Sequence, residues 1–297
     1  MPKLMHFNHL KRRAAAIVYV TSMLAAPLLA QPSIGGGACT SGSLNGIYAA
    51  SITGRALTAA AMGSATYSNV FQANGSATFD GLSKVTLTLT ADTNQAAATS
   101  LAWSGTYSVQ ANCAGAISIA TGGSATLILA IDNAGAGFLL SGSDAGYTYS
   151  GSGNSQPSGC AATTFSGVYT LTGTGFALNA GAVSGAENGT GLLQFDGQGN
   201  VTANITMSAN GAPSSALTLT GTYTVSSSCL GSATLTDASA NTYAMSFSIY
   251  NSKVSSTAFY AMLAESSKFL IAGSGHALYG QPAATAARRG RDGRERA

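Results

Sequence analysis

The feature that most constrains the fold of this chain is an internal duplication. Three short motifs occur twice, at offsets of 121 or 116 residues. The matching segments are 46–48 with 167–169 (Gly-x-Tyr), 79–81 with 195–197 (Phe-Asp-Gly) and 105–107 with 221–223 (Gly-Thr-Tyr). A repeat of this length predicts two copies of one domain-sized unit. We place the copies at 39–153 and 160–280, joined by a short linker at 154–159.

Both copies have the hydrophobic pattern of β-strands. Apolar and polar residues alternate through 201–208 and 217–225, and again through 85–90 and 101–109. Alternation with one polar face is typical of antiparallel strands that cover a core. The strands expected in the second copy are 167–175, 190–196, 200–208, 215–226, 231–237, 242–250, 257–264 and 267–274.

The turns between most of these segments are short, which favours an up-and-down meander. Eight meandering strands can close into a barrel whose interior is filled by side chains or holds one small ligand. We therefore predict an all-β chain of two tandem antiparallel up-and-down β-barrels with about eight strands each. A two-sheet sandwich is the alternative. Gly105 and Gly221 stand in mid-strand, where a barrel corner needs a close backbone approach.

The four cysteines occupy equivalent places in the two copies. No pair is close enough in sequence to form a metal knuckle, and an even number in an exported chain indicates disulfides. The pairing compatible with duplication joins Cys39 to Cys113 and Cys160 to Cys229. We expect each disulfide to stay within its own copy.

The ends of the chain predict export. Lys11, Arg12 and Arg13 precede an apolar run at 14–30, which is the pattern of a secretory signal peptide at 1–30. A membrane anchor is disfavoured because the run has 17 residues, fewer than the ~20 that span a bilayer. We expect a mature chain without a transmembrane segment, secreted to the periplasm or the extracellular space.

The formal net charge of +3 belongs to the two ends of the chain. Basic residues precede the apolar run at 14–30, and five arginines lie in 281–297, which we interpret as a disordered basic tail. The repeated body carries more acidic than basic residues. A basic footprint spread over the fold is therefore missing from the sequence. This pattern argues against nucleic acid as a partner.

The order of the blocks carries a resemblance. Each copy opens with Cys and Gly-x-Tyr, continues with Phe-Asp-Gly and Gly-Thr-Tyr, and then has a second Cys. This order resembles a class of exported bacterial proteins of unknown function built from such modules, over most of 39–280. The Gly-x-Tyr opening is also similar to the Gly-x-Trp start of lipocalin and avidin-type (calycin-like) barrels. That likeness implies a barrel but transfers no ligand, because the vitamin-binding polar residues of avidin-like proteins have no counterpart here.

The sequence lacks the motifs of common catalytic sites, so we expect that the protein is not an enzyme. His276 is the single histidine after the signal peptide, and the nucleophile elbow, the phosphate loop and the His-x-x-x-His pair are missing from the sequence. Asp80 and Asp196 are equivalent between the copies, but both precede Gly in turns, where Asp accepts hydrogen bonds from its own backbone. We expect no catalytic residue, no metal site and no cofactor.

Large aromatic residues on the inward faces are the candidates for a ligand pocket. These are Trp103, Tyr48, Tyr107, Tyr169 and Tyr223. A buried tyrosine needs a partner for its hydroxyl, so these side chains either line a pocket or pack a core. If either barrel holds a ligand, we expect it to be the first, because Trp103 corresponds to Leu219 in the second.

The function expected from the sequence is that of an exported non-enzymatic binding protein that carries a small apolar ligand in a barrel. Its partner would be a small hydrophobic molecule or a component of the cell surface. The alternative is a structural or adhesive cell-surface module whose barrels are filled by side chains.

Overall fold

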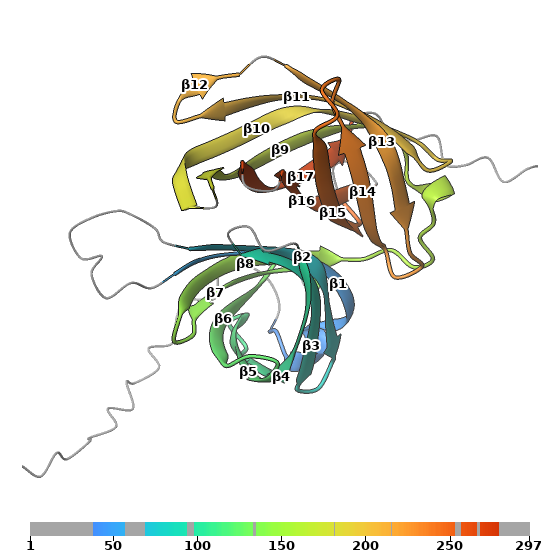
Figure 1. Ribbon diagram of the computed structural model, residues 1–297. Helices are drawn as coiled ribbons and strands as arrows, with labels where there is room; N and C mark the ends of the chain where they lie inside the picture. The colour runs from blue at the N-terminus through green and yellow to red at the C-terminus, as the bar shows by residue number, and fades with distance from the viewer. Residues whose placement is uncertain are drawn as a thin grey trace, which may run out of the picture. The chain divides into compact units, whose positions relative to one another are not determined.

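The computed structural model describes 38–56, 69–93, 98–132, 135–180, 182–214, 216–252, 257–265 and 268–278. These residues form two closed, eight-stranded antiparallel barrels, which confirms the predicted fold class (Figure 1). The predicted signal peptide and basic tail lie outside the described residues. Among the helices of the described segments, none has the length and apolar character needed to cross a bilayer.

Barrel 1 is the blue-to-green part of Figure 1. Its strands are β1 (Asn45–Ala56), β2 (Val70–Asp80), β3 (Lys84–Thr93), β4 (Thr99–Val109), β5 (Ala114–Thr121), β6 (Ala125–Asp132), β7 (Gly137–Ser143) and β8 (Tyr147–Ser155). Each strand pairs with the next one along the chain, and β8 returns to pair with β1. The result is the up-and-down meander that the short turns predict.

Barrel 2 repeats this topology. Its strands are β9 (Ser166–Asn179), β10 (Ala182–Asp196), β11 (Asn200–Ala209), β13 (Leu217–Val225), β14 (Leu230–Thr236), β15 (Thr242–Tyr250), β16 (Ala258–Glu265) and β17 (Phe269–Ala277). Neighbours along the chain pair again, and β17 closes the ring on β9. A two-residue strand, β12 (Ala212–Pro213), pairs with the end of β11 alone among the described strands.

Two expectations about barrel 2 need correction. Strand β10 begins at Ala182, eight residues before the predicted start at 190. Its first half carries small and polar residues in place of an apolar alternation, and the hydrogen-bonded ladder with β9 holds it instead. The short strand β12 was not expected, because it has no hydrophobic pattern.

Both predicted disulfides are present, Cys39 with Cys113 and Cys160 with Cys229. Each one ties the segment before the first strand of a barrel to the turn between its fourth and fifth strands. The separations along the chain are 74 and 69 residues. Cross-links over loops of this length remove much conformational entropy from the unfolded chain.

The mid-strand glycines lie where neighbouring strands approach most closely. A Cβ atom on Gly105 would lie 1.9 Å from the carbonyl oxygen of Ser118, and one on Gly221 would lie 1.9 Å from that of Thr234. A side chain at either position would overlap the backbone of the next strand. The close approach predicted at these glycines is therefore confirmed.

Some strands are buried on both faces because the barrels contact each other within a single compact unit. All of β16 is buried or nearly so, including the outward-facing Tyr260. Asn74 of β2 donates a hydrogen bond to the carbonyl oxygen of Ser246 (2.6 Å) and accepts one from the Ser246 hydroxyl (2.8 Å). The Tyr260 hydroxyl accepts hydrogen bonds from Ser152 (2.9 Å) and Asn154 (2.6 Å).

Candidate functional site

The equivalent tyrosines Tyr107 and Tyr223 each hold a short 3-10 helix, η1 (Ser41–Ser43) or η3 (Ala162–Thr164), near one end of a barrel. The Tyr107 hydroxyl lies 2.9 and 3.0 Å from the carbonyl oxygens of Ser41 and Leu44. The Tyr223 hydroxyl makes the matching contacts around η3, at 3.0 and 2.9 Å. Burial raises the pKa of both hydroxyls, so they remain neutral donors. These two pocket candidates therefore hold a 3-10 helix at one end of each barrel, which we call closing the barrel.

Tyr48 and Tyr169 lie deep inside barrels 1 and 2. Each ring meets a phenylalanine edge-on, Phe79 for Tyr48 and Phe195 for Tyr169, with ring centroids 5.6 Å apart in both cases. The Tyr48 hydroxyl donates a hydrogen bond to the carbonyl oxygen of Gly135 at 2.7 Å. Both tyrosines therefore belong to packed aromatic cores.

Trp103 belongs to an aromatic cluster at the opposite end of barrel 1. Its ring stacks on Phe71 with centroids 6.1 Å apart and meets Tyr149 edge-on at 5.6 Å. Only 5% of Trp103 is exposed. The structure thus places Trp103 in a buried aromatic cluster with Phe71 and Tyr149, and a pocket beside it stays a prediction.

The paired aspartates are turn residues, as the sequence predicts. Oδ1 of Asp80 accepts backbone hydrogen bonds from Leu82, Ser83 and Lys84 at 2.8 to 2.9 Å, and Asp196 makes similar contacts in barrel 2. The backbone bonds lower the pKa of the Asp80 carboxyl, and a side-chain hydrogen bond from Asn200, together with backbone bonds, lowers that of Asp196. Within the described residues, no group of three or more His, Cys, Asp or Glu side chains could hold a metal ion.

A cavity of about 560 Å³ is lined mainly by residues of β14 to β17. We call it the wall cavity. Its apolar lining includes Leu178, Met245, Met262, Phe269 and Leu270. Thr90, Asp92 and Ala98 of barrel 1 and Glu265 of barrel 2 complete part of its rim. An apolar cavity with a few polar groups is the usual form of a small-molecule site.

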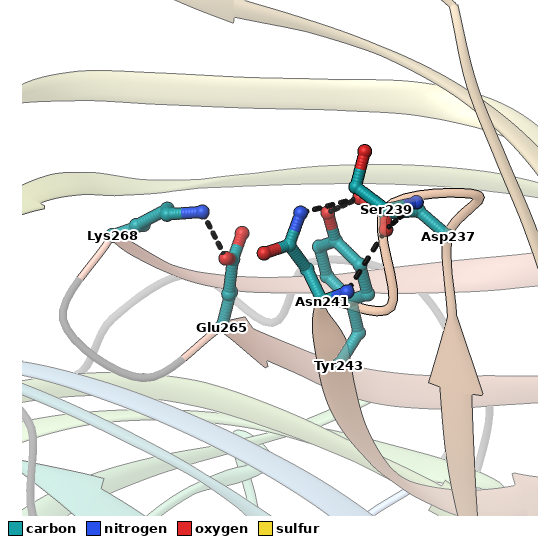
Figure 2. Close-up of polar contacts among 6 residues, drawn as sticks. All are labelled: Asp237, Ser239, Asn241, Tyr243, Glu265 and Lys268. Carbon is teal, nitrogen blue, oxygen red and sulfur yellow. Dashed lines mark hydrogen bonds and ion pairs between the residues drawn. The ribbon is translucent and has the colours of Figure 1, made fainter.

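A polar cluster lies at the β14–β15 and β16–β17 turns, at one end of barrel 2 (Figure 2). We call this end the mouth of barrel 2. Oδ2 of Asp237 accepts hydrogen bonds from Asn241 (2.8 Å) and from the Tyr243 hydroxyl (2.9 Å). Glu265 forms an ion pair with Lys268. Burial and the neighbouring carboxylates of Asp237 and Glu265 raise the pKa of Tyr243.

Glu187 is a further carboxylate near this mouth, on the inward face of β10. It is 5% exposed. Burial alone raises its pKa, with no hydrogen bond or charge acting on the carboxyl. In barrel 1 the matching position is Phe71, at the offset of 116 residues that aligns the Phe-Asp-Gly motifs. The position therefore changes from an aromatic core residue to a buried acid.

Comparison with known proteins gives no family for this chain. No protein family matches it, and no curated protein matches it either. The likeness to lipocalin and avidin-type barrels stays a prediction.

Proposed function

We propose that this chain is an exported, non-enzymatic binding protein that holds a small apolar molecule in the wall cavity. The observation that carries the proposal is the cavity itself. Its volume of about 560 Å³ falls within the range of ~300–1,000 Å³ typical of ligand pockets. Met245 and Met262 line it, and methionine side chains adapt to ligands of different shapes.

The proposed site differs from the one expected in barrel 1. In barrel 1, Trp103 and its aromatic neighbours pack against one another as core residues. Export is supported by the two disulfides, which persist in oxidising compartments. Under this proposal the barrels are the scaffold, and the ligand binds against their outer walls.

The test uses the neutral fluorescent probe N-phenyl-1-naphthylamine and the full chain. Ala264 lines the wall cavity, so Ala264→Phe should fill part of it and weaken probe binding by about tenfold or more. Ala116 lies exposed on β5 of barrel 1, and Ala116→Phe is the matched control that should leave binding unchanged. Native mass spectrometry of the freshly purified chain should also detect a bound small molecule.

A second candidate function is a structural or adhesive module of the cell surface. The cluster of buried side chains inside each barrel favours it, because such clusters pack a core without a ligand. In that case the probe would bind without saturation, both phenylalanine variants would behave alike, and no small molecule would accompany the purified chain.

A further inference from the structure

The inward face of β10 places an acid in an apolar interior. Inward and outward positions alternate along this strand, and Leu193 and Phe195, which share the parity of Glu187, belong to the core of barrel 2. Glu187 pairs with Gly175 of β9, and Gly175 pairs with Ile271 of β17. Because Gly175 has no side chain, nothing on β9 separates Glu187 from β17.

The side chains around the inward position next to Glu187 are apolar. At Gly189, the next inward position, a Cβ atom would contact Ile271, Ile205 and Met207 at 3.5 to 3.9 Å. These are ordinary contact distances, so this part of the interior accepts an additional methyl-sized group. Neither of the strands that flank β10, β9 and β11, contains an acidic or basic residue.

Acidic residues are rarely buried without a partner, because an isolated carboxylate in an apolar environment is costly. Glu187 is only 5% exposed, and it makes no hydrogen bond or ion pair with another residue of the described segments. Glu265 and Asp237 at the mouth differ in this respect, because Lys268 neutralises the first and Asn241 and Tyr243 satisfy the second. Glu187 is thus the one acid of this group that lacks a partner within the described part of the chain.

We propose that the mouth of barrel 2 binds a small organic cation, an amine or quaternary ammonium group on an apolar body, with the Glu187 carboxylate as its counter-ion. An ammonium group would supply the missing donor and charge, while the aliphatic walls would contact the apolar body. The stacked rings of Tyr243 and Phe269 at the mouth, 6.0 Å apart, offer π-faces that attract cations. Acids at the mouth further disfavour anionic ligands. Phe269 lines both the mouth and the wall cavity, whereas Glu187 belongs to the mouth alone of these two sites.

The sequence offers a direct spectroscopic test because it contains three glutamates, Glu187, Glu265 and Glu295. Full-length chain labelled with carboxyl-¹³C glutamate should show three carboxyl signals, and Glu187→Gln assigns the relevant one. The probes are hexylamine, hexanol and hexanoate, which share an apolar body and differ in charge. Hexylamine should shift the Glu187 signal saturably and lower its titration midpoint, whereas hexanol and hexanoate should not.

Two variants separate recognition from general electrostatics. Glu187→Gln should weaken hexylamine binding, measured by calorimetry, by about tenfold or more, because it removes a charge-assisted bond. Asp196→Asn is the matched control, because this acid lies in the β10–β11 turn at the other end of barrel 2, and it should leave binding unchanged. Equal effects of the two variants, an unshifted Glu187 signal, or equal binding of hexanol would overturn the proposal. If Glu187→Gln does not fold, the titration of the wild-type signal decides alone.

Discussion

The close strand approach at Gly221 makes a quantitative prediction about barrel 2. In Gly221→Ala the new Cβ would lie 1.9 Å from the carbonyl oxygen of Thr234 and 2.9 Å from Cα of Leu235, whereas ordinary contact begins at 3.4 Å. The strands β13 and β14 must therefore separate by about 1.5 Å at this point. Overpacking of this kind costs about 1–3 kcal/mol of unfolding free energy. We expect the melting temperature to fall by about 2–4 °C for each kcal/mol lost.

The matched control is Gly189→Ala in the same barrel. Its nearest neighbour would be Cδ1 of Ile271 at 3.5 Å, so the methyl group fits without a shift. Replacing glycine at a compatible position stabilises a protein by about 0.4–1 kcal/mol through the unfolded state. Differential scanning calorimetry of both full-length variants should give opposite shifts. If Gly221→Ala melts at or above the temperature of Gly189→Ala, the described approach of β13 and β14 is wrong.

Three further predictions concern cross-links, closure and titration. Removing the Cys160–Cys229 disulfide by a double alanine substitution should cost about 4.4 kcal/mol in chemical denaturation, from the entropy of a 69-residue loop; a cost near zero would contradict this. Tyr107→Phe and Tyr223→Phe should each lower the free energy of unfolding in urea by about 1–3 kcal/mol, because buried carbonyl oxygens lose their hydrogen-bond donor. Unchanged urea midpoints would show that the hydroxyls do not close the barrels. Glu187→Gln should have a higher melting temperature than wild type at pH 7. Burial raises the pKa of the Glu187 carboxyl in the folded chain, so ionisation of this group at pH 7 favours the unfolded chain of the wild type. The difference should fade near pH 4, where the carboxyl becomes protonated in the unfolded chain as well. A difference that grows toward acid would refute the sign.

The periodicity of the sequence predicts most of the fold because one face of nearly every strand meets solvent. Strand β15 occupies the predicted range 242–250 without change. The disulfide pairing follows from the equivalence of the two copies, and the structure confirms it. In these cases the local pattern and the tertiary structure agree, so the alternation alone identifies strand and face.

The contact between the barrels could not be predicted in this way. Strand β16 reads as an almost continuous apolar run, 258–264, because its outward side chains pack against barrel 1 as well as its inward ones pack the core. In barrel 1 the position equivalent to Tyr260 is Leu139, which is 57% exposed. The run in the second copy was a signal of burial on both faces, but the sequence does not say what covers the outer one.

The partners of the inward tyrosines were also beyond the reach of sequence patterns. The inward positions of Tyr107 and Tyr223 follow from alternation, and buried hydroxyls need partners. Those partners are carbonyl oxygens 58 to 66 residues earlier in the chain. Backbone acceptors carry no sequence signature, so the choice between pocket and core required the structure.

The two copies differ most clearly at the barrel ends opposite the 3-10 helices. Residues that close a barrel are the same in both, as Tyr107 and Tyr223 illustrate. At the other end, Phe71 and Trp103 of barrel 1 stack on each other, whereas their equivalents in barrel 2 are Glu187 and Leu219. Replacing a stacked phenylalanine by an unpaired acid gains nothing for packing and costs desolvation. Because stability does not account for an acid at that position, a cation that pairs with it provides the better physical explanation, and the variants at Glu187 test this site separately from the wall cavity.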